Sequence, residues 1–377
     1  MIRNLRRTHA RVRDSVVTDL CTQKILKYTL PHKTEYELVY AKNKNTLSNV
    51  NKYLKNDTCS VIGYGPQGQA QALNLRDTGI NVCVGVRENG ESWNNALKDN
   101  FIPNKTLFPI KEAVNNGTII MLLLSDAGQI DIYPKIKHQL NNKTLYFSHG
   151  FGVVFNELTK IDTNNQNNPK NSDVIMVAPK GSGKSVRELY KTGGGINSSY
   201  AVHRNDTKTA EKKALALGFA IGSPYIYKTT FEHEVYSDLT GERSILMGGI
   251  AGLFKAQYDV LRERGHSPSE AYNETVEEAL QSLYPLINEK GMEYMFSNCS
   301  TTAQRGALDW YHMFEKLNKP LIEKIYDSVV SGKEAKRTID CNSKPGYRES
   351  LKKELKKIND MEIWRVGKEI RKLRKIT

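Results

Sequence analysis

The stretch Ser60-Val61-Ile62-Gly63-Tyr64-Gly65-Pro66-Gln67-Gly68 decides the fold of this chain. A short apolar run is followed at once by a Gly-x-Gly-x-x-Gly set and then by a predicted helix over residues 67–77. Glycines here let the backbone turn tightly and approach a pyrophosphate, which lies at the helix N-terminus where free N–H groups favour anions. The stretch predicts a dinucleotide-binding βαβ unit, although a purely structural glycine turn can look the same.

Apolar runs of similar length recur after this motif, separated by helical stretches. Runs without alternation are typical of strands buried on both faces of a parallel sheet with crossover helices. The predicted strands cover residues 60–62, 82–86, 118–124, 144–147 and 173–177. We therefore expect an α/β, doubly wound, Rossmann-like domain. After about residue 230 helical periodicity takes over, with a capping box at Ser267 and Glu270.

Three parts are expected along the 377 residues: a lead-in with a targeting-like start over 1–55, a nucleotide-binding domain over 56–230 and an all-helical domain over 231–377. The formal net charge is +14, but residues 1–13 hold five Arg and no acid, and residues 350–377 carry a net +6. The body of the chain is therefore nearly neutral. The five cysteines include no Cys-x-x-Cys pair and are expected to be reduced thiols. No apolar run approaches the roughly 20 residues of a membrane span.

The two basic ends receive different interpretations. The acid-free start, MIRNLRRTHARVR, is typical of a mitochondrial-type targeting segment, with a solvated basic tail as the alternative. We expect a mitochondrial location and leave another organelle or the cytosol open. The end of the chain alternates Lys and Arg with Leu, Ile and Trp364, which favours a surface helix over a nucleic-acid-binding arm.

Arg87 points to the kind of dinucleotide. It ends the second predicted strand, 19 residues after Gly68, where an NAD-binding protein usually has an acid for the ribose 2′-hydroxyl. An arginine followed by Ser92 offers a cation and a hydroxyl for a 2′-phosphate, which favours NADP(H) over NAD(H). A solvated loop arginine, neutralised by Glu88 and Glu91, is the alternative.

Polar residues collect where three successive predicted strands end. Ligands of open α/β sheets bind beyond the carboxyl ends of the strands, so these residues are expected at one edge. They are Ser125, Asp126 and Gln129 after the third strand, His149 after the fourth and Lys180 after the fifth. We expect an active cleft there. A P-loop over residues 181–185 is rejected because its first glycine would fall at Ala178.

Two carboxylate pairs occur at helical spacing later in the chain, Asp238 with Glu242 and Glu274 with Glu278. Like charges four residues apart share a helix face and repel each other. Four converging carboxylates would bind Mg²⁺, which prefers oxygen ligands and leaves positions for substrate. Solvated acids on exposed helices are the alternative, and Glu277 beside Glu278 fits it.

These motifs stand in longer stretches that resemble one family from about residue 56 to the end of the chain. The stretches are GYGPQGQAQALNLRD, VGVRENGESW, LLSDAGQ, YFSHGF, VAPKGSGKSVR, GINSSYAV, YSDLTGERSILMGG, GHSPSEAYNETVEEALQSLYPLI, CSTTAQRGALDWY and MEIWRVGKEIRKLR. The chain resembles ketol-acid reductoisomerase, also called acetohydroxy acid isomeroreductase, and especially its short fungal mitochondrial type.

The resemblance implies an activity and an assembly. An alkyl group of 2-acetolactate or 2-aceto-2-hydroxybutyrate migrates under Mg²⁺, and NADPH then reduces the product. This yields 2,3-dihydroxyisovalerate or 2,3-dihydroxy-3-methylvalerate in valine and isoleucine biosynthesis. The resemblance also implies a knotted helical domain intertwined in a homodimer, with each active site taking its two carboxylate pairs from different subunits.

The resemblance assigns roles to individual residues as well. It implies NADPH contacts at Tyr64, Gly65, Pro66, Gln67, Arg87, Ser92, Asp126, Ala127, Gly128, Gln129 and Gly183, in addition to Ser125 and the loop glycines Gly63 and Gly68. It implies two Mg²⁺ ions at Asp238, Glu242, Glu274 and Glu278, with Asp238 bridging. Ser300 should contact the substrate, His149 and Lys180 should line the reaction centre, and Glu278 or a metal-bound hydroxide should act as base.

Two other functions remain as alternatives at this point. A metal-independent, NADP-dependent hydroxyacid dehydrogenase would account for the glycine loop and Lys180 but would leave the four carboxylates without a role. In a non-enzymatic alternative, the basic ends bind organellar nucleic acid and the cofactor domain is regulatory. Such binding would weaken steeply with salt.

Overall fold

A computed structural model describes residues 19–163 and 169–374. The targeting-like segment 1–13 lies outside the described residues. The chain divides into two compact units, Met1–Val235 (unit 1) and Tyr236–Thr377 (unit 2), and each is described by itself. Over the described ranges, no helix combines the length and the apolar character that crossing a membrane requires. All five cysteines are free thiols, as expected.

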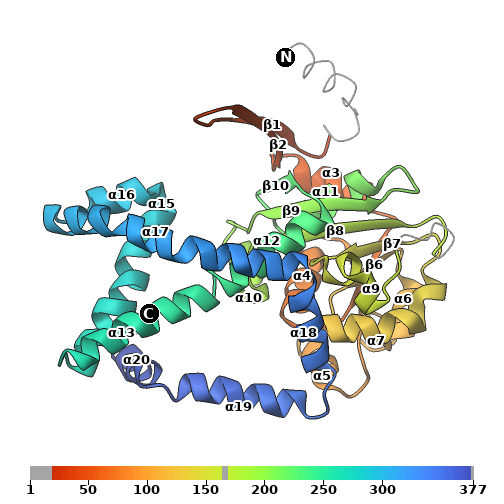
Figure 1. The fold of residues 1–377 in the computed structure, drawn as a ribbon. Coiled ribbons are helices and arrows are strands. Elements are labelled where there is room, and N and C mark those ends of the chain that lie inside the picture. The colour runs from red at the N-terminus through yellow and green to blue at the C-terminus, as the bar shows by residue number, and fades with distance from the viewer. Residues whose placement is uncertain (1–18, 164–168, 375–377) are drawn as a thin grey trace. The chain divides into compact units, whose positions relative to one another are not determined.

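Unit 1 contains one mixed sheet (Figure 1), with the strand order β1-β2-β10-β9-β8-β7-β6-β3-β4-β5. The run β5-β4-β3-β6-β7-β8 is parallel throughout. It has the 3-2-1-4-5-6 order of a dinucleotide-binding fold, so the doubly wound prediction is confirmed. The strands are β1 Thr22–Thr29, β2 Thr34–Ala41, β3 Thr58–Ile62, β4 Asn81–Gly85, β5 Leu107–Phe108, β6 Ile119–Leu122, β7 Thr144–Phe147, β8 Asp173–Pro179, β9 Ser198–Arg204 and β10 Tyr225–Lys228.

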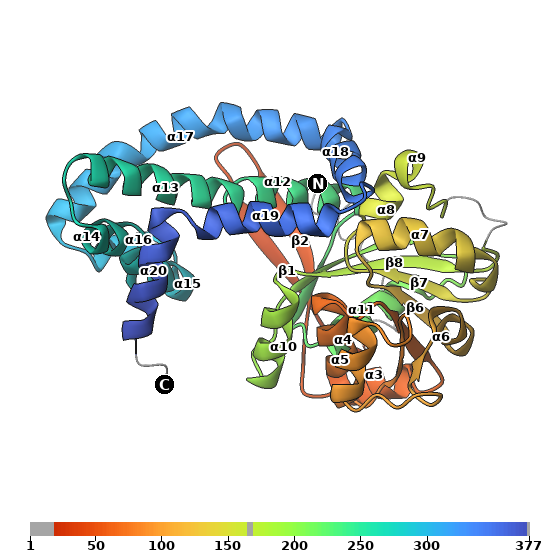
Figure 2. The ribbon, with the colours of Figure 1, turned by 90° about the horizontal axis from the view of Figure 1, so that it is seen from below.

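Helices cover both faces of this sheet (Figure 2). Val61 packs into the core under α3, α4, α5 and α11, whereas its neighbour Ile62 packs into the core under α6, α7 and α8. Because both faces are covered, burial does not alternate along β3: Thr58 is half-buried and the four residues after it are buried. The helices are α3 Thr46–Tyr53, α4 Pro66–Asp77, α5 Glu91–Lys98, α6 Ile110–Asn116, α7 Asp126–Ile136, α8 Phe151–Val154, α9 Asn156–Thr159, α10 Gly183–Lys191 and α11 Ala210–Ala220.

The lead-in, where the sequence shows no period, contains a β-hairpin and α3. β1 and β2 pair antiparallel along their whole length, and β2 joins the main sheet through Tyr225, Ile226 and Tyr227 of β10. All eight residues of β1 are exposed, whereas Tyr40 of β2 packs edge-on against Tyr200. A strand solvated on both faces needs no apolar period, which explains why sequence patterning did not reveal it.

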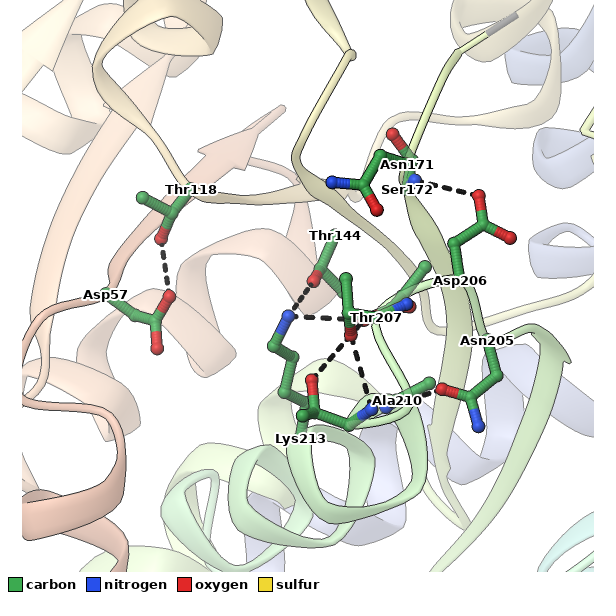
Figure 3. A network of polar contacts seen from close by, with 12 residues as sticks. Asp57, Thr118, Thr144, Asn171, Ser172, Asn205, Asp206, Thr207, Ala210 and Lys213 are labelled. Atoms are coloured by element: carbon green, nitrogen blue, oxygen red, sulfur yellow. Dashed lines mark hydrogen bonds and ion pairs between the residues drawn. The ribbon is translucent and has the colours of Figure 1, made fainter. Parts of the chain in front are cut away.

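A buried polar network fastens the amino ends of the parallel strands, at the edge opposite the predicted cleft (Figure 3). Lys213 of α11 donates to Thr144 Oγ1, at the start of β7, over 2.8 Å. The same ammonium lies 3.2 Å from Asp173 Oδ2, at the start of β8. Thr207 donates to this carboxylate through its backbone N–H and its hydroxyl. Asp173 is fully buried, so the network joins two strands and α11 at their starts.

Unit 2 is helical in its described residues, as predicted, and α12 Phe231–Arg243 leads into it. Ser267 and Glu270 form the expected capping box. The further helices are α13 Gly248–Glu263, α14 Pro268–Tyr272, two π-helical segments Asn273–Glu277 and Ala279–Leu283, α15 Tyr284–Lys290, α16 Met292–Ser297, α17 Thr301–Val330, α18 Lys333–Asn342, α19 Tyr347–Asn359 and α20 Glu362–Leu373.

The basic end of the chain forms α19 and α20. Ile363 of α20 is buried with Tyr258 and Tyr272, and a Cβ at Gly367 would lie 2.4 Å from the Tyr272 ring. A glycine at this position therefore allows α20 to pack directly on that ring. This packing agrees with the surface-helix interpretation.

The long helix α17 leaves much of its apolar surface exposed. Of its residues only Val329 is buried, and Trp310, Phe314 and Leu317 are 64%, 55% and 70% exposed. Large exposed apolar patches on soluble proteins mark interaction sites. We call these three exposed residues the α17 apolar surface.

Candidate active site

The glycine loop follows β3 at the point where the strand order reverses between β3 and β6. Gly63 has a φ of +100°, and a Cβ there would lie 2.8 Å from the Leu123 carbonyl oxygen. A Cβ at Gly68 would lie 2.2 Å from the Gly63 oxygen, so this glycine lets α4 start directly against the strand. A Cβ at Gly65 would meet nothing within 4 Å. This open position is where a pyrophosphate can approach the backbone.

The N-termini of α4 and α10 lie against each other. A Cβ at Gly183 would lie 2.2 Å from the carbonyl carbon and oxygen of Pro66. Gln67 Nε2 donates to the Gly181 carbonyl oxygen over 2.9 Å. Because each helix start presents free N–H groups and a positive dipole end, the pair forms a favourable place for a phosphate group.

A cavity of about 720 Å³ lies beside these two helix starts. Its volume falls within the range of ligand pockets, roughly 300–1,000 Å³. The lining residues are Tyr64, Gly65, Pro66, Gln69, Ala70 and Leu73 around α4, Glu91, Ser92 and Asn95 on α5, and Gly183, Lys184, Arg187, Glu188 and Lys191 on α10. Five predicted cofactor residues, Tyr64, Gly65, Pro66, Ser92 and Gly183, are among them.

The α10 side of the cavity is basic, which the sequence analysis missed. Lys184, Arg187 and Lys191 are spaced by three and four residues, so they share one helix face. Arg187 is held in place by an ion pair with Asp77 at 2.7 Å and a hydrogen bond to Asn74 Oδ1 at 2.8 Å. The spacing of these three cations, the first of which lies seven residues after the strand predicted over 173–177, was the available signal.

Arg87, the predicted 2′-phosphate ligand, lies in the turn that follows β4. The Gly90 N–H donates to the Arg87 carbonyl oxygen over 3.3 Å and closes this turn. The Arg87 side chain is exposed and is not one of the cavity-lining residues. Its neighbour Ser92 does line the cavity, so the turn lies next to it.

Tyr64 in the glycine loop is anchored to the far end of α5. Its hydroxyl donates to Asp99 Oδ2 over 2.9 Å, and Gln69 Nε2 donates to the same oxygen over 2.7 Å. Burial raises the pKa of the Tyr64 hydroxyl, and Asp99 raises it further. The hydroxyl therefore stays protonated and holds one wall of the cavity to another.

The ends of β6, β7 and β8 bring Asp126, His149 and Lys180 to one edge, as predicted, because these strands are parallel neighbours. Burial raises the pKa of Asp126, and the electrostatic interaction with His149 opposes this rise. Asp126 and His149 are therefore close enough to interact. His149 also stacks on Phe151, with ring centroids 6.2 Å apart.

The predicted cofactor run from Ser125 to Gln129 forms the start of α7. The Ser125 hydroxyl caps this helix by accepting from the Gly128 N–H over 3.3 Å. Gln129 is buried and donates to the Leu124 carbonyl oxygen over 3.0 Å. In this structure these two side chains hold the junction between β6 and α7.

Glu234 is a buried partner of Lys180 that the sequence analysis missed. Its Oε2 forms an ion pair with Lys180 Nζ and accepts from the Ser199 hydroxyl over 2.7 Å. Glu234 is only 4% exposed, and a buried carboxylate requires such partners. The pair therefore fixes the Lys180 ammonium at the strand edge. The sequence did carry one signal for Glu234. It lies four residues before Asp238 on α12, so the two acids share one helix face.

The two carboxylate pairs lie on separate elements. Asp238 and Glu242 are one turn apart on α12, and Glu242 lies 3.6 Å from the Arg243 guanidinium. Glu274 and Glu278 are exposed in the π-helical region, a conformation that is frequent at functional sites. Within residues 19–163 and 169–374, no three His, Cys, Asp or Glu side chains are grouped so that they could hold a metal. One chain therefore does not bring the four carboxylates together.

Glu277 and Ser300 lie in different surroundings, since one is buried and the other exposed. From the sequence, Glu277 fitted the alternative of solvated acids, but it is buried and accepts from Arg374 Nε over 2.6 Å and from Gln281 Nε2 over 2.9 Å. Its neighbour Glu278 stays exposed. Ser300, the predicted substrate contact, is the exposed N-cap of α17 and accepts from the Ala303 N–H over 3.2 Å.

A doubly wound sheet with an open glycine loop, and with proton-carrying side chains at the adjacent strand ends, defines a dinucleotide-dependent oxidoreductase. Comparison with known families makes the class specific. Residues 53–225 match the family model described as acetohydroxy acid isomeroreductase, NADPH-binding domain, and residues 231–376 match that of the ketol-acid reductoisomerase C-terminal domain. The chain belongs to the ketol-acid reductoisomerase family, so it is an enzyme, and the resemblance found in the sequence is confirmed.

Similarity to individual proteins supports the same family. The chain is 59% identical over 323 residues to "Ketol-acid reductoisomerase, mitochondrial" of Neurospora crassa, covering 85% of this chain and 79% of that protein. It is 53% identical over 339 residues to "Ketol-acid reductoisomerase (NAD(+))" of Desulfosudis oleivorans, covering 90% and 95%. The solved structure of an NADH-preferring ketol-acid reductoisomerase from an uncultured archean matches with a TM-score of 0.76 at 34% identity, covering 86% of this chain and 97% of that one.

Proposed function

We propose that this chain catalyses the Mg²⁺-dependent alkyl migration of 2-acetolactate or 2-aceto-2-hydroxybutyrate and the reduction of the product by NADPH. The observation that carries the proposal is the Lys180 ammonium, fixed by buried Glu234 at the same strand edge as His149. This edge belongs to a chain whose N-terminal part matches an NADPH-binding domain. The reaction needs proton-carrying groups beside a hydride donor, and this edge supplies them.

The cofactor half of the site lies in unit 1. The two helix N-termini at Pro66 and Gly183 would bind the pyrophosphate, and the basic cavity with Ser92 and the adjacent Arg87 would bind the adenosine end with its 2′-phosphate. When bound, NADPH supplies the hydride that adds to the carbonyl carbon. The carbonyl oxygen then requires a proton, for which Lys180 and His149 are the donors at this edge.

The carboxylate pairs would hold Mg²⁺, which when bound polarises the hydroxyl and carbonyl oxygens of the substrate. Carboxylate oxygens are the donors this ion prefers. Asp238 and Glu242 form one pair, and Glu274 and Glu278, with Glu278 as the base, form the other. Ser300 would contact the substrate through its exposed hydroxyl. Each pair alone is too small a ligand set for two ions.

We propose that each metal site is completed by a second copy of the chain. The separation of the pairs within one chain supports this, and so does the α17 apolar surface, because large exposed apolar surfaces mark interaction sites. A homodimer with shared active sites satisfies both observations.

The test is NADPH oxidation with 2-acetolactate, with and without Mg²⁺, in wild type and Asp238→Asn. We expect Mg²⁺-dependent turnover in wild type and its loss by about a thousandfold or more in the variant, since a metal ligand supports several kcal/mol of charge stabilisation. Asp259→Asn is the matched control, because Asp259 is a helical carboxylate paired with Lys255. Turnover that ignores Mg²⁺ and survives Asp238→Asn would contradict the metal-dependent step and favour a hydroxyacid dehydrogenase.

We also propose a mitochondrial location. The Neurospora crassa relative is named as mitochondrial, and residues 1–13 have the matching composition. Import of the full chain into isolated mitochondria should be lost when Arg3, Arg6, Arg7, Arg11 and Arg13 are replaced by Gln. Equal import of both chains would contradict the targeting role.

A further inference from the structure

A series of buried hydrogen bonds links the glycine loop to the end of β7 through Gln71. This residue lies on α4 and is fully buried. Its Nε2 donates to Ser148 Oγ over 2.8 Å and to Gln67 Oε1 over 3.1 Å. Its Oε1 accepts from the Tyr146 hydroxyl over 2.9 Å. Both hydrogens and the oxygen of one amide are therefore used.

The orientation of this amide is determined by Tyr146. Burial raises the pKa of the Tyr146 hydroxyl, so the hydroxyl stays protonated and donates to its nearest acceptor, Gln71 Oε1. With its oxygen committed, the amide must turn its nitrogen toward Ser148 and Gln67. A fully bonded buried amide specifies one arrangement, because any other leaves polar groups unpaired in the core.

The series ends beside each of the two candidate proton donors. Ser148 directly precedes His149 at the end of β7. Gln67, bonded to the same Gln71 nitrogen, donates onward to the carbonyl oxygen of Gly181, which directly follows Lys180. Gln71 is therefore linked directly to Ser148, the neighbour of His149, and through Gln67 to Gly181, the neighbour of Lys180.

We propose that Gln71 is a positioning residue for the reaction: through Ser148 it fixes His149, and through Gln67 it keeps the ends of β7 and β8 in register with the glycine loop. This inference rests on the proposed function, since the site it serves is the NADPH-dependent one. Packing alone does not call for glutamine at this position, because an apolar side chain would fill a fully buried position of α4 without needing three partners.

The experiment compares Gln71→Met, Ser148→Ala and the double variant. Methionine matches the length of glutamine and removes all three hydrogen bonds. We expect each single variant to lower kcat about tenfold and to change KM for NADPH less than about threefold, because a misplaced group costs rate more than binding. The double variant should be no slower than the slower single one, since both changes break the same link.

Thr78→Val is the matched control. Thr78 is buried at the end of the same helix, and its hydroxyl contacts Asn74, Tyr190 and Ala220, away from the strand ends. This variant should lower Tm and leave kcat at the wild-type value. If Gln71→Met behaves like Thr78→Val, or if the losses from Gln71→Met and Ser148→Ala multiply, the positioning role is overturned.

A second measurement needs no turnover. The ring signals of His149 in a ¹H–¹³C spectrum, assigned with His149→Gln, should shift in Gln71→Met and in Ser148→Ala but not in Thr78→Val. Ser148 is only half-buried, so Ser148→Ala tests the link even where Gln71→Met fails to fold. Absence of Mg²⁺-dependent turnover in wild type would contradict the proposed function, whereas an unmoved His149 signal would overturn the positioning role on its own.

Discussion

Unit 1 finds partners for its buried charges within a single chain, whereas unit 2 leaves apolar surface exposed and its carboxylate pairs apart. Unit 1 packs its sheet between two cores, and its buried charges find partners in the same unit, as Asp173 does with Lys213 and Glu234 with Lys180. Unit 2 leaves the α17 apolar surface in solvent and keeps its two carboxylate pairs apart. The difference indicates that the cofactor half of the site forms within a single chain, whereas the metal half, as we propose, forms only in an assembly.

A mixture of two inactive variants is the strongest way to break this comparison. Asp238→Asn damages one carboxylate pair and Glu274→Gln the other, and each alone should lose turnover about a thousandfold or more. If the pairs of one site come from different copies, half of randomly mixed dimers are mixed and each retains one intact site. Activity should then recover to about a quarter of wild type.

The control is a mixture of Asp238→Asn with Glu242→Gln. These changes lie in the same pair, so a mixed dimer has no intact site and should stay inactive. If neither mixture recovers although mixed dimers form, each site takes all its carboxylates from one chain, and unit 2 is as complete as unit 1.

Asp173→Asn tests the claim that unit 1 is stable by its own contacts. The substitution removes the charge that Lys213 faces at 3.2 Å, and breaking such a buried pair costs about 3 kcal/mol of the free energy of unfolding. Denaturant unfolding at several protein concentrations should show the same loss at each. Asp131→Asn, which breaks an exposed pair with Lys135, should cost less than about 1 kcal/mol. A cost equally small for Asp173→Asn would mean that this network contributes little.

Arg87→Ala sharpens the account of the cofactor half. Removal of a charge-assisted contact to the 2′-phosphate should raise the Kd for NADPH about tenfold, or about 1.4 kcal/mol, and leave the Kd for NADH nearly unchanged. Titration of the protein with NADPH and with NADH measures both Kd values. Lys191→Ala is included for comparison, because it removes a different cation, on the α10 side of the cavity. Equal weakening of both dinucleotides by Arg87→Ala would refute its 2′-phosphate role.

The smallest effect is expected from an ion pair within unit 2. Arg243 Nε lies 2.9 Å from Glu334 Oε2, and this hydrogen bond lowers the pKa of Glu334 below its ordinary value. An acid with a lowered folded-state pKa stabilises the fold above its unfolded pKa, and this contribution is lost as the pH falls through the folded pKa. Glu334→Gln should therefore cost no more than about 1 kcal/mol at neutral pH, and this cost should disappear as the pH falls through the lowered folded-state pKa of Glu334. A cost that persists in acid would have another origin.

The sequence predicted those strands whose buried positions are occupied mostly by apolar residues. β3 and β6 to β8 are apolar because both of their faces are covered. β9 was missed because two of its core positions are serines, Ser198 and Ser199, whose hydroxyls bond to Ser223 and Glu234. Glu234 itself was missed because its partner Lys180 lies 54 residues earlier in the chain. The four-residue spacing from Asp238 could place Glu234 on the same helix face, but its pairing with Lys180 depends on the topology.

The candidate site divides in the same way. The glycine loop and the strand-end residues were predictable because their spacing follows from one βαβ unit after another. The basic face of α10 was readable from the spacing of its cations, but its place at the cavity depends on the packing of α10 along α4. The spacing of the carboxylate pairs was also readable, but their meeting point depends on surfaces that a single chain does not contain.

The pairing of β2 with β10 has a consequence for the order in which the sheet is built. Tyr40 pairs with Ile226, so the hairpin emerges first from the ribosome but has no place to dock until nearly all of unit 1 has been made. At about 5–20 residues per second, the hairpin waits on the order of 10–40 s with its edges unpaired. The inner parallel strands can meanwhile assemble from successive βαβ units. The oldest part of the nascent sheet is therefore among the last to be placed, and during that interval its open edges are the part most exposed to wrong strand partners.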